Sequence, residues 1–123
     1  MKAPGQDEVV HTFNAFRWSI KGLVSAWRTE ISFRVDVILF VLFFAAGLWL
    51  GDGAVEKAVL VAPLFLVLAL DLLNAAVETV VDMVSPDYSE AAGRAKDMAS
   101  AGVFCAMVSV IVVWALILVP RYL

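Results

Sequence analysis

Residues 98–119 read MASAGVFCAMVSVIVVWALILV, a run of 22 residues without a charged side chain. About 20 apolar residues on a helix cross a bilayer core of ~30 Å, so this run predicts a transmembrane helix. Hydrophobic residues make up 63 % of the 123-residue chain, against roughly 45–50 % in ordinary soluble domains. A soluble protein this small has too little interior to bury so much apolar surface. The sequence therefore predicts a single integral membrane domain over residues 1–123.

Two more transmembrane helices are predicted before this run, over residues 31–50 and 58–84. The first contains an uncharged stretch over residues 37–50, and a tight Gly-Asp-Gly turn follows it at residues 51–53. The second is long enough to span but carries three acidic residues. A loop follows it at residues 85–89, because Pro86 disfavours helix at the residue before it.

Residues 7–29 show a different pattern, with large apolar side chains recurring every three or four residues. Phe13, Phe16, Ile20, Leu23 and Trp27 fall on one face of a helix, and polar or basic residues occupy the opposite face. This pattern is typical of an amphipathic helix in the membrane interface, with its basic face toward anionic head groups. The alternative is a helix packed on a soluble partner.

The distribution of basic residues predicts the orientation of the chain. Three spans place the N-terminus and the loop after residue 84 on the same side of the membrane. That side holds seven of the nine lysines and arginines, namely Lys2, Arg17, Lys21, Arg28, Arg34, Arg94 and Lys96. Because short cytoplasmic segments carry the excess of lysine and arginine, we expect the N-terminus to be cytoplasmic.

A stripe of polar residues follows one face of the predicted helix at 58–84. Asp71, Asn74, Glu78 and Asp82 are spaced by three, four and four residues, which puts them on one side of a helix. An ionisable side chain near the centre of a membrane costs at least ~2.5 kcal/mol on insertion scales. Asp82 alone is explained by a surface position, but Asp71 with Glu78 points to function.

A second polar group stands at the start of the last predicted span. Gly93, Lys96, Asp97 and Ser100 share one helix face in the run GRAKDMAS at residues 93–100. A lysine with small residues near a helix start suits a phosphate group, and the alternative is a cationic flank that follows the positive-inside rule. Glu30 ends the amphipathic helix on the same side, where it could join Glu78 around a metal ion. Neither a Walker A loop nor a GxGxxG turn is present.

These residues resemble the motifs of the prokaryotic diacylglycerol kinase family. The run from Asp71 to Asp82, DLLNAAVETVVD, is similar to the family pattern ExxNxxxExxxD, and GRAKDMAS at 93–100 is similar to GRAKDMxS. The stretch KGLVSAWRTEISFR at residues 21–34 resembles KGLxxAWxxExxFR. The three motifs occur in the family's order and span most of the chain.

The resemblance implies an all-α homotrimer that transfers the γ-phosphate of ATP to the hydroxyl of diacylglycerol at the cytoplasmic face of the bacterial inner membrane. It implies that Glu30 and Glu78 hold Mg²⁺, that Lys96 neutralises the phosphates, that Asn74 lines the reacting centre and that Asp71 is the general base. The expected partners are ATP, a membrane lipid and further copies of the chain, with no nucleic acid.

The resemblance also implies a wider set of contacts. Residues expected at the nucleotide are His11, Arg17, Ser19, Glu30, Glu78, Tyr88, Glu90, Gly93, Lys96 and Asp97. Residues expected at the lipid are Trp27, Glu30, Arg34, Asp71, Ser100 and Trp114.

The sequence departs from the family where glutamate is usual, because position 71 is an aspartate whose carboxyl group is one methylene closer to the backbone. His11 stands where the family often has a more basic residue. Three alternatives stay open: an undecaprenol kinase, a small proton or ion carrier, and a weakly catalytic relative with a regulatory role. A proton carrier would not need Lys96 and Asp97 together with Glu30.

Overall fold

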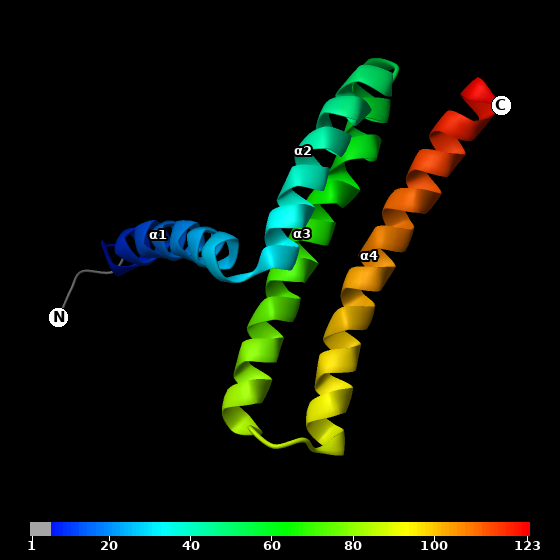
Figure 1. Ribbon diagram of the computed structural model, residues 1–123. Helices are drawn as coiled ribbons and strands as arrows, with labels where there is room; N and C mark the ends of the chain where they lie inside the picture. The colour runs from blue at the N-terminus through cyan, green and yellow to red at the C-terminus, as the bar shows by residue number, and fades with distance from the viewer. Residues whose placement is uncertain (1–5) are drawn as a thin grey trace.

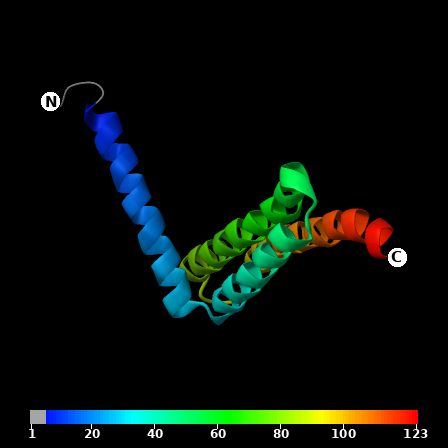
Figure 2. The same ribbon diagram turned by 90° about the horizontal axis from the view of Figure 1, so that it is seen from above.

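The computed structural model describes residues 6–123, which form four helices and no strand. They are α1 (Gln6–Thr29), α2 (Ile31–Leu50), α3 (Gly53–Val84) and α4 (Glu90–Tyr122). Helices α2 and α3 lie side by side, α4 packs along α3, and α1 projects sideways from this bundle (Figures 1 and 2). The predicted all-α architecture is confirmed. Lys2, one of the basic residues used for orientation, lies outside the described residues.

Three of the helices, α2, α3 and α4, are long and apolar enough to cross a membrane. The bundle buries few side chains, and its core consists of Ala26, Phe33, Leu60, Leu64 and Ala106. Large apolar residues cover the rest of the surface, such as Leu116, which is 72 % exposed. Exposure of such an apolar surface to water is unfavourable. The chain is therefore a multi-pass membrane protein whose outer faces contact lipid or other protein.

The breaks between helices follow from local sequence. Gly53 adopts a positive φ of 81°, a conformation that glycine accepts without a steric cost. A Cβ atom on Gly51 would lie 2.6 Å from Lys57 Cγ, so this turn also needs a glycine. Ser89 caps α4 by accepting a hydrogen bond from Ala92 N at 3.1 Å. Helices α3 and α4 therefore begin before the apolar stretches that start at residues 58 and 98.

The outer end of the bundle, near the α2–α3 turn, is joined by polar contacts. The Arg121 guanidinium donates to Leu50 O at 2.9 Å and forms an ion pair with Glu56. Asp52 N also donates to Glu56 Oε1, at 3.2 Å. These contacts tie the end of α4 to both helices of the turn.

Helix α4 is also locked to α3 inside the bundle. Pro63 lacks an N–H group, so the carbonyl of Val59, four residues earlier, loses its usual helical donor. Trp114 Nε1 donates to Leu60 O in that turn at 3.0 Å, and the Trp114 ring packs edge-on against Phe43. The indole therefore links α4 to the turn of α3 that precedes Pro63.

Replacing Trp114 by phenylalanine should remove this hydrogen bond and leave the Leu60 carbonyl without its indole donor. We expect the variant to be destabilised by about 1 kcal/mol, the usual net value of one hydrogen bond. Thermal unfolding in detergent, followed by circular dichroism, measures the loss. Trp49→Phe is the matched control, because Trp49 is 84 % exposed. Equal unfolding temperatures for the two variants would contradict this role for Trp114.

Candidate functional site

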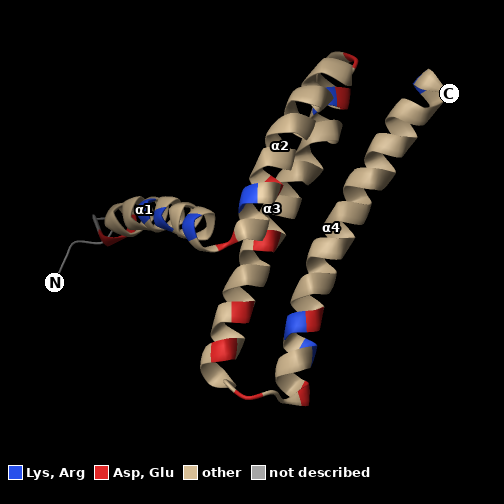
Figure 3. Ribbon diagram, viewed as in Figure 1, with Lys and Arg blue, Asp and Glu red and all other residues tan. Residues whose placement is uncertain are grey.

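The acidic stripe lies on the half of α3 that is remote from the α2–α3 turn. Figure 3 shows acidic bands along this half of α3 and a mixed cluster of charges at the facing end of α4, whose middle carries none. The Lys96 Nζ atom lies 2.6 Å from Asp82 Oδ1. The negative charge of Glu78 also attracts the Lys96 ammonium group. The ammonium group therefore bridges the two motifs that the sequence analysis singled out.

A cleft of about 330 Å³ opens where α3, the loop and α4 meet. Its lining includes Asp82, Tyr88, Gly93, Lys96 and Asp97. The Tyr88 ring packs over Gly93, where a Cβ atom would lie 3.4 Å from Tyr88 Cε2. Four predicted nucleotide residues thus line one cleft, in which a cation stands beside an aromatic ring.

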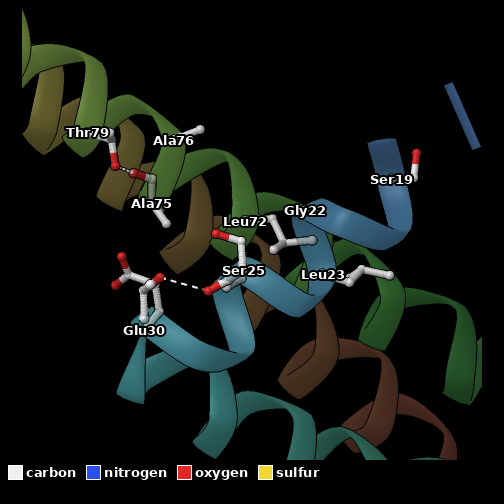
Figure 4. A pocket seen from close by; sticks show the side chains of 11 residues that line it. Ser19, Gly22, Leu23, Ser25, Glu30, Leu72, Ala75, Ala76 and Thr79 are labelled. Atoms are coloured by element: carbon white, nitrogen blue, oxygen red, sulfur yellow. Dashed lines mark hydrogen bonds between the residues drawn. The ribbon is translucent and has the colours of Figure 1, made fainter. Parts of the chain in front are cut away.

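A second and larger cleft, of about 520 Å³, separates α1 from α3. Figure 4 shows Glu30 facing α3 across this cleft, opposite Ala75 and Thr79. The hydroxyl groups of Thr29 and Thr79 donate to carbonyls of their own helices, Ser25 O and Ala75 O, at 2.8 and 3.0 Å. The walls are therefore mostly small and apolar, and the Glu30 carboxylate is the charged group of the cleft.

Glu30 is held at the break between α1 and α2, where its backbone is extended, with φ −113° and ψ 107°. The Arg34 side chain crosses this break and donates to Arg28 O at 2.9 Å and to Trp27 O. A cation over the free carbonyls of a helix end satisfies them and favours the helix dipole. Arg34, predicted as a lipid contact, therefore also fixes the corner that carries Glu30.

Deeper in the bundle, Asp71 does not stand alone. The carboxyl group of Asp36 on α2 lies within hydrogen-bonding reach of the Asp71 carboxyl group. One turn closer to the loop, Asn74 Oδ1 is buried with no hydrogen-bond partner among the described residues. Asp36 was not among the residues that the sequence predicted at the site. Its place beside Asp71 depends on the register between α2 and α3, which the pattern within either helix does not fix.

The remaining predicted residues are spread over the chain. Ser19 lines the α1–α3 cleft and Glu90 is the first residue of α4. His11 packs edge-on against Trp18, and it lies with the exposed Arg17 on the part of α1 farther from the bundle. Ser100 is exposed on α4, and Trp114 lies toward the outer end beside Leu60. Within one chain the structure does not bring these last four residues to either cleft.

A metal site built by the protein alone needs several ligand side chains close to one point. Within residues 6–123, no three His, Cys, Asp or Glu side chains come together in a group that could hold a metal. Glu30 lines the α1–α3 cleft, whereas Glu78 lies on the neighbouring face of α3, beside Lys96. Within one described chain, the two predicted metal ligands therefore belong to no cluster of three such side chains.

Comparisons with known proteins point to one family. The sequence pattern described as prokaryotic diacylglycerol kinase matches residues 17–118. A diacylglycerol kinase of Haemophilus influenzae is 40 % identical over 110 residues, which cover 89 % of this chain and 93 % of the relative. The Escherichia coli K12 enzyme is 37 % identical over 101 residues, covering 82 % and 83 %. The Pseudomonas aeruginosa enzyme is 37 % identical over 114 residues, covering 93 % of both chains.

The matched residues include the acidic stripe of α3, the Lys96 motif of α4 and the corner at Glu30. Taken with the membrane-spanning bundle that carries them, the match over most of the chain shows that it belongs to the prokaryotic diacylglycerol kinase family of lipid kinases.

Proposed function

We propose that the chain transfers the γ-phosphoryl group of ATP to the hydroxyl group of diacylglycerol and so forms phosphatidic acid, with Mg²⁺ as the metal. The observation that carries this proposal is the position of Lys96, which faces the carboxylates of α3 in a cleft at the polar end of an apolar bundle. Phosphoryl transfer depends mainly on charge neutralisation and alignment, and a lysine with metal-binding carboxylates supplies the first.

Glu30 and Glu78 are the residues that would hold Mg²⁺. The ion usually keeps several water ligands and binds one or two protein carboxylates together with substrate phosphates. Carboxylate oxygens are ligands of this kind, and Asn74 offers a buried carbonyl oxygen that lacks a partner among the described residues. The metal supplies charge neutralisation for the transferring phosphoryl group.

Lys96 would exchange its contact with Asp82 for the phosphates of ATP. Its side chain is 41 % exposed, so it can reach a ligand in the cleft without leaving its helix. Tyr88 and Gly93, which line the same cleft, would border the nucleotide. A further contact to the phosphate chain is proposed for Asp97 through the metal or water.

Diacylglycerol would approach from the bilayer, because its acyl chains must stay in an apolar medium. The α1–α3 cleft gives its hydroxyl end a small-residue passage beside Glu30, and Trp27 is 45 % exposed at the end of α1. Asp71 would take the hydroxyl proton while the oxygen bonds to the γ-phosphorus and the bond to ADP breaks. The phosphoryl group then resides on the lipid.

Assembly as a homotrimer is part of the same proposal. One chain leaves Glu78 exposed on α3 and the Asn74 carbonyl oxygen unpaired. Small residues such as Ala99, Ala101 and Gly102 would let helices of other copies approach closely. Orientation with the N-terminus in the cytoplasm, in the bacterial inner membrane, puts the Lys96 cleft on the side where ATP is found.

Replacing Glu78 by glutamine should reduce kcat by about 100-fold or more, because the neutral amide cannot balance a divalent cation. Activity is measured with purified protein in mixed micelles of lipid and detergent over a range of Mg²⁺ concentrations. Glu8→Gln, on an exposed position of α1, is the control and should be unaffected. A folded Glu78→Gln enzyme that keeps most of its activity would show that the metal assignment is wrong.

Replacing Lys96 by methionine should raise the KM for ATP about tenfold or more and leave the KM for diacylglycerol nearly unchanged. The reason is that the ammonium group meets only the phosphates, in a charge-assisted contact. Lys57→Met, at the opposite end of α3, tests the general effect of losing a lysine. The opposite split, with poorer lipid affinity and unchanged ATP affinity, contradicts the assignment.

The lipid specificity is tested by transfer of labelled γ-phosphate to a panel of lipid alcohols in Mg²⁺. We expect dioleoylglycerol to be phosphorylated with a kcat/KM at least about tenfold above that for undecaprenol, since the family matched is that of diacylglycerol kinases. A preference for undecaprenol would replace the proposed substrate. Absence of transfer to every alcohol would reject the kinase activity and favour a carrier.

A further inference from the structure

The packing of α2 against α3 sets which residues stand opposite one another. The two helices are antiparallel, and a Cβ atom built on Gly47 would lie 3.4 Å from Leu60 Cβ. Moving eleven residues from each of these toward the loop end reaches Asp36 on α2 and Asp71 on α3. Eleven residues are about three helical turns, so both aspartates lie on the same helix faces as the contacting pair.

The side chains follow this register, because the carboxyl groups of Asp36 and Asp71 lie within hydrogen-bonding reach of one another. Both residues are half-buried. A carboxylate accepts hydrogen bonds and cannot donate one, so a bond between two carboxyl groups requires one proton. A hydrogen bond shared by the two carboxyl groups would therefore leave the pair with one proton and one negative charge.

Among the described residues, no cationic side chain is paired with Asp36 or Asp71. Asp36 borders a groove of about 220 Å³ whose other lining residues are all apolar, and α4 contributes Met107, Val110 and Ile111 to it. Arg34, the nearest charged residue along α2, donates to carbonyls at the end of α1. Two full charges at this depth would repel each other in a medium of low dielectric, and a shared proton removes that repulsion.

We propose that Asp36 is a positioning residue for the reaction, which holds the Asp71 carboxylate in place and shares one proton with it. The proposal rests on the proposed role of Asp71 as the base. Aspartate at position 71 is short, and a second carboxyl group bound to it fixes which oxygen faces the lipid hydroxyl. A displacement of about 1 Å at a reacting group can lower a rate about 100-fold, so this fixation matters.

The proton balance of the step is simple. The singly charged pair takes the proton of the lipid hydroxyl and becomes neutral, with two protons. The hydroxyl oxygen forms its bond to the γ-phosphorus as the bond from that phosphorus to the ADP oxygen breaks. The pair then releases one proton to water at the polar end of the bundle and returns to its starting charge.

The first test is a mutant cycle on the full chain in phosphatidylcholine micelles, with dioleoylglycerol, ATP and Mg²⁺. Asp36→Asn should lower kcat about tenfold or more and leave the KM for ATP within about twofold, because the amide keeps the shape but cannot share a proton in the same way. In the Asp71→Asn background the same change should cost nothing further. Asp52→Asn, at the outer turn, is the control and should keep wild-type kcat.

The second test is the pH profile of kcat, which a purely structural role would not move. The wild type should show an acid and an alkaline limb, since the singly protonated pair is the active form. Asp36→Asn should lose the alkaline limb. Asp36→Glu keeps the shared proton, so it should keep both limbs while lowering kcat, and it serves if Asp36→Asn does not fold.

The outcomes separate this inference from the proposed function. If Asp71→Asn is inactive but Asp36→Asn has wild-type kcat and both limbs, Asp36 has no positioning role and Asp71 remains the base. If Asp71→Asn is fully active, the base assignment itself fails. An additive loss in the double variant would mean that Asp36 acts independently of Asp71, which overturns the inference.

Discussion

The high free-energy cost of ionised side chains in a bilayer is the constraint on which the rest of this structure depends. Helix α3 carries Asp71, Glu78 and Asp82 on one face, and each must find a partner, a proton or water. The acidic residues have different partners at different positions along α3. Asp82 pairs with Lys96 where the bundle is polar, and Asp71 pairs with Asp36 where it is apolar. A carboxylate that needs a partner in a medium of low dielectric is also suited to accept a proton or to bind a cation.

Two local features bring these groups to one end of the bundle. The break at Glu30, bridged by Arg34, turns α1 away from α2 and opens the cleft against α3. The short loop between α3 and α4, closed by the Ser89 cap, sets Lys96 beside Asp82. The locks at Trp114 and Arg121 lie farther out and hold the helices in register. These two locks thus lie in the half near the α2–α3 turn, whereas Lys96 and the acidic stripe lie in the half near the loop.

Much of this could be predicted from sequence, because helices in lipid must be long and apolar and because acids among apolar residues stand out. The three spans follow from those rules, and the resemblance to the family implied that Lys96 lies near the stripe. The Asp36–Asp71 pair was missed, since it depends on the register between α2 and α3, which periodicity within one helix does not fix. For the same reason, sequence did not predict that Trp114 bonds to Leu60 O.

The central claim is that the polar stripe of α3 is tolerated because other copies of the chain enclose it. The described chain leaves Glu78 exposed and the Asn74 oxygen buried without a partner. The most direct test is the mass of the protein released from membranes into a mild detergent, measured by native mass spectrometry on a sample whose kinase activity is assayed in parallel. The account predicts one species of three copies, with activity in that species. A stable, fully active monomer would contradict it.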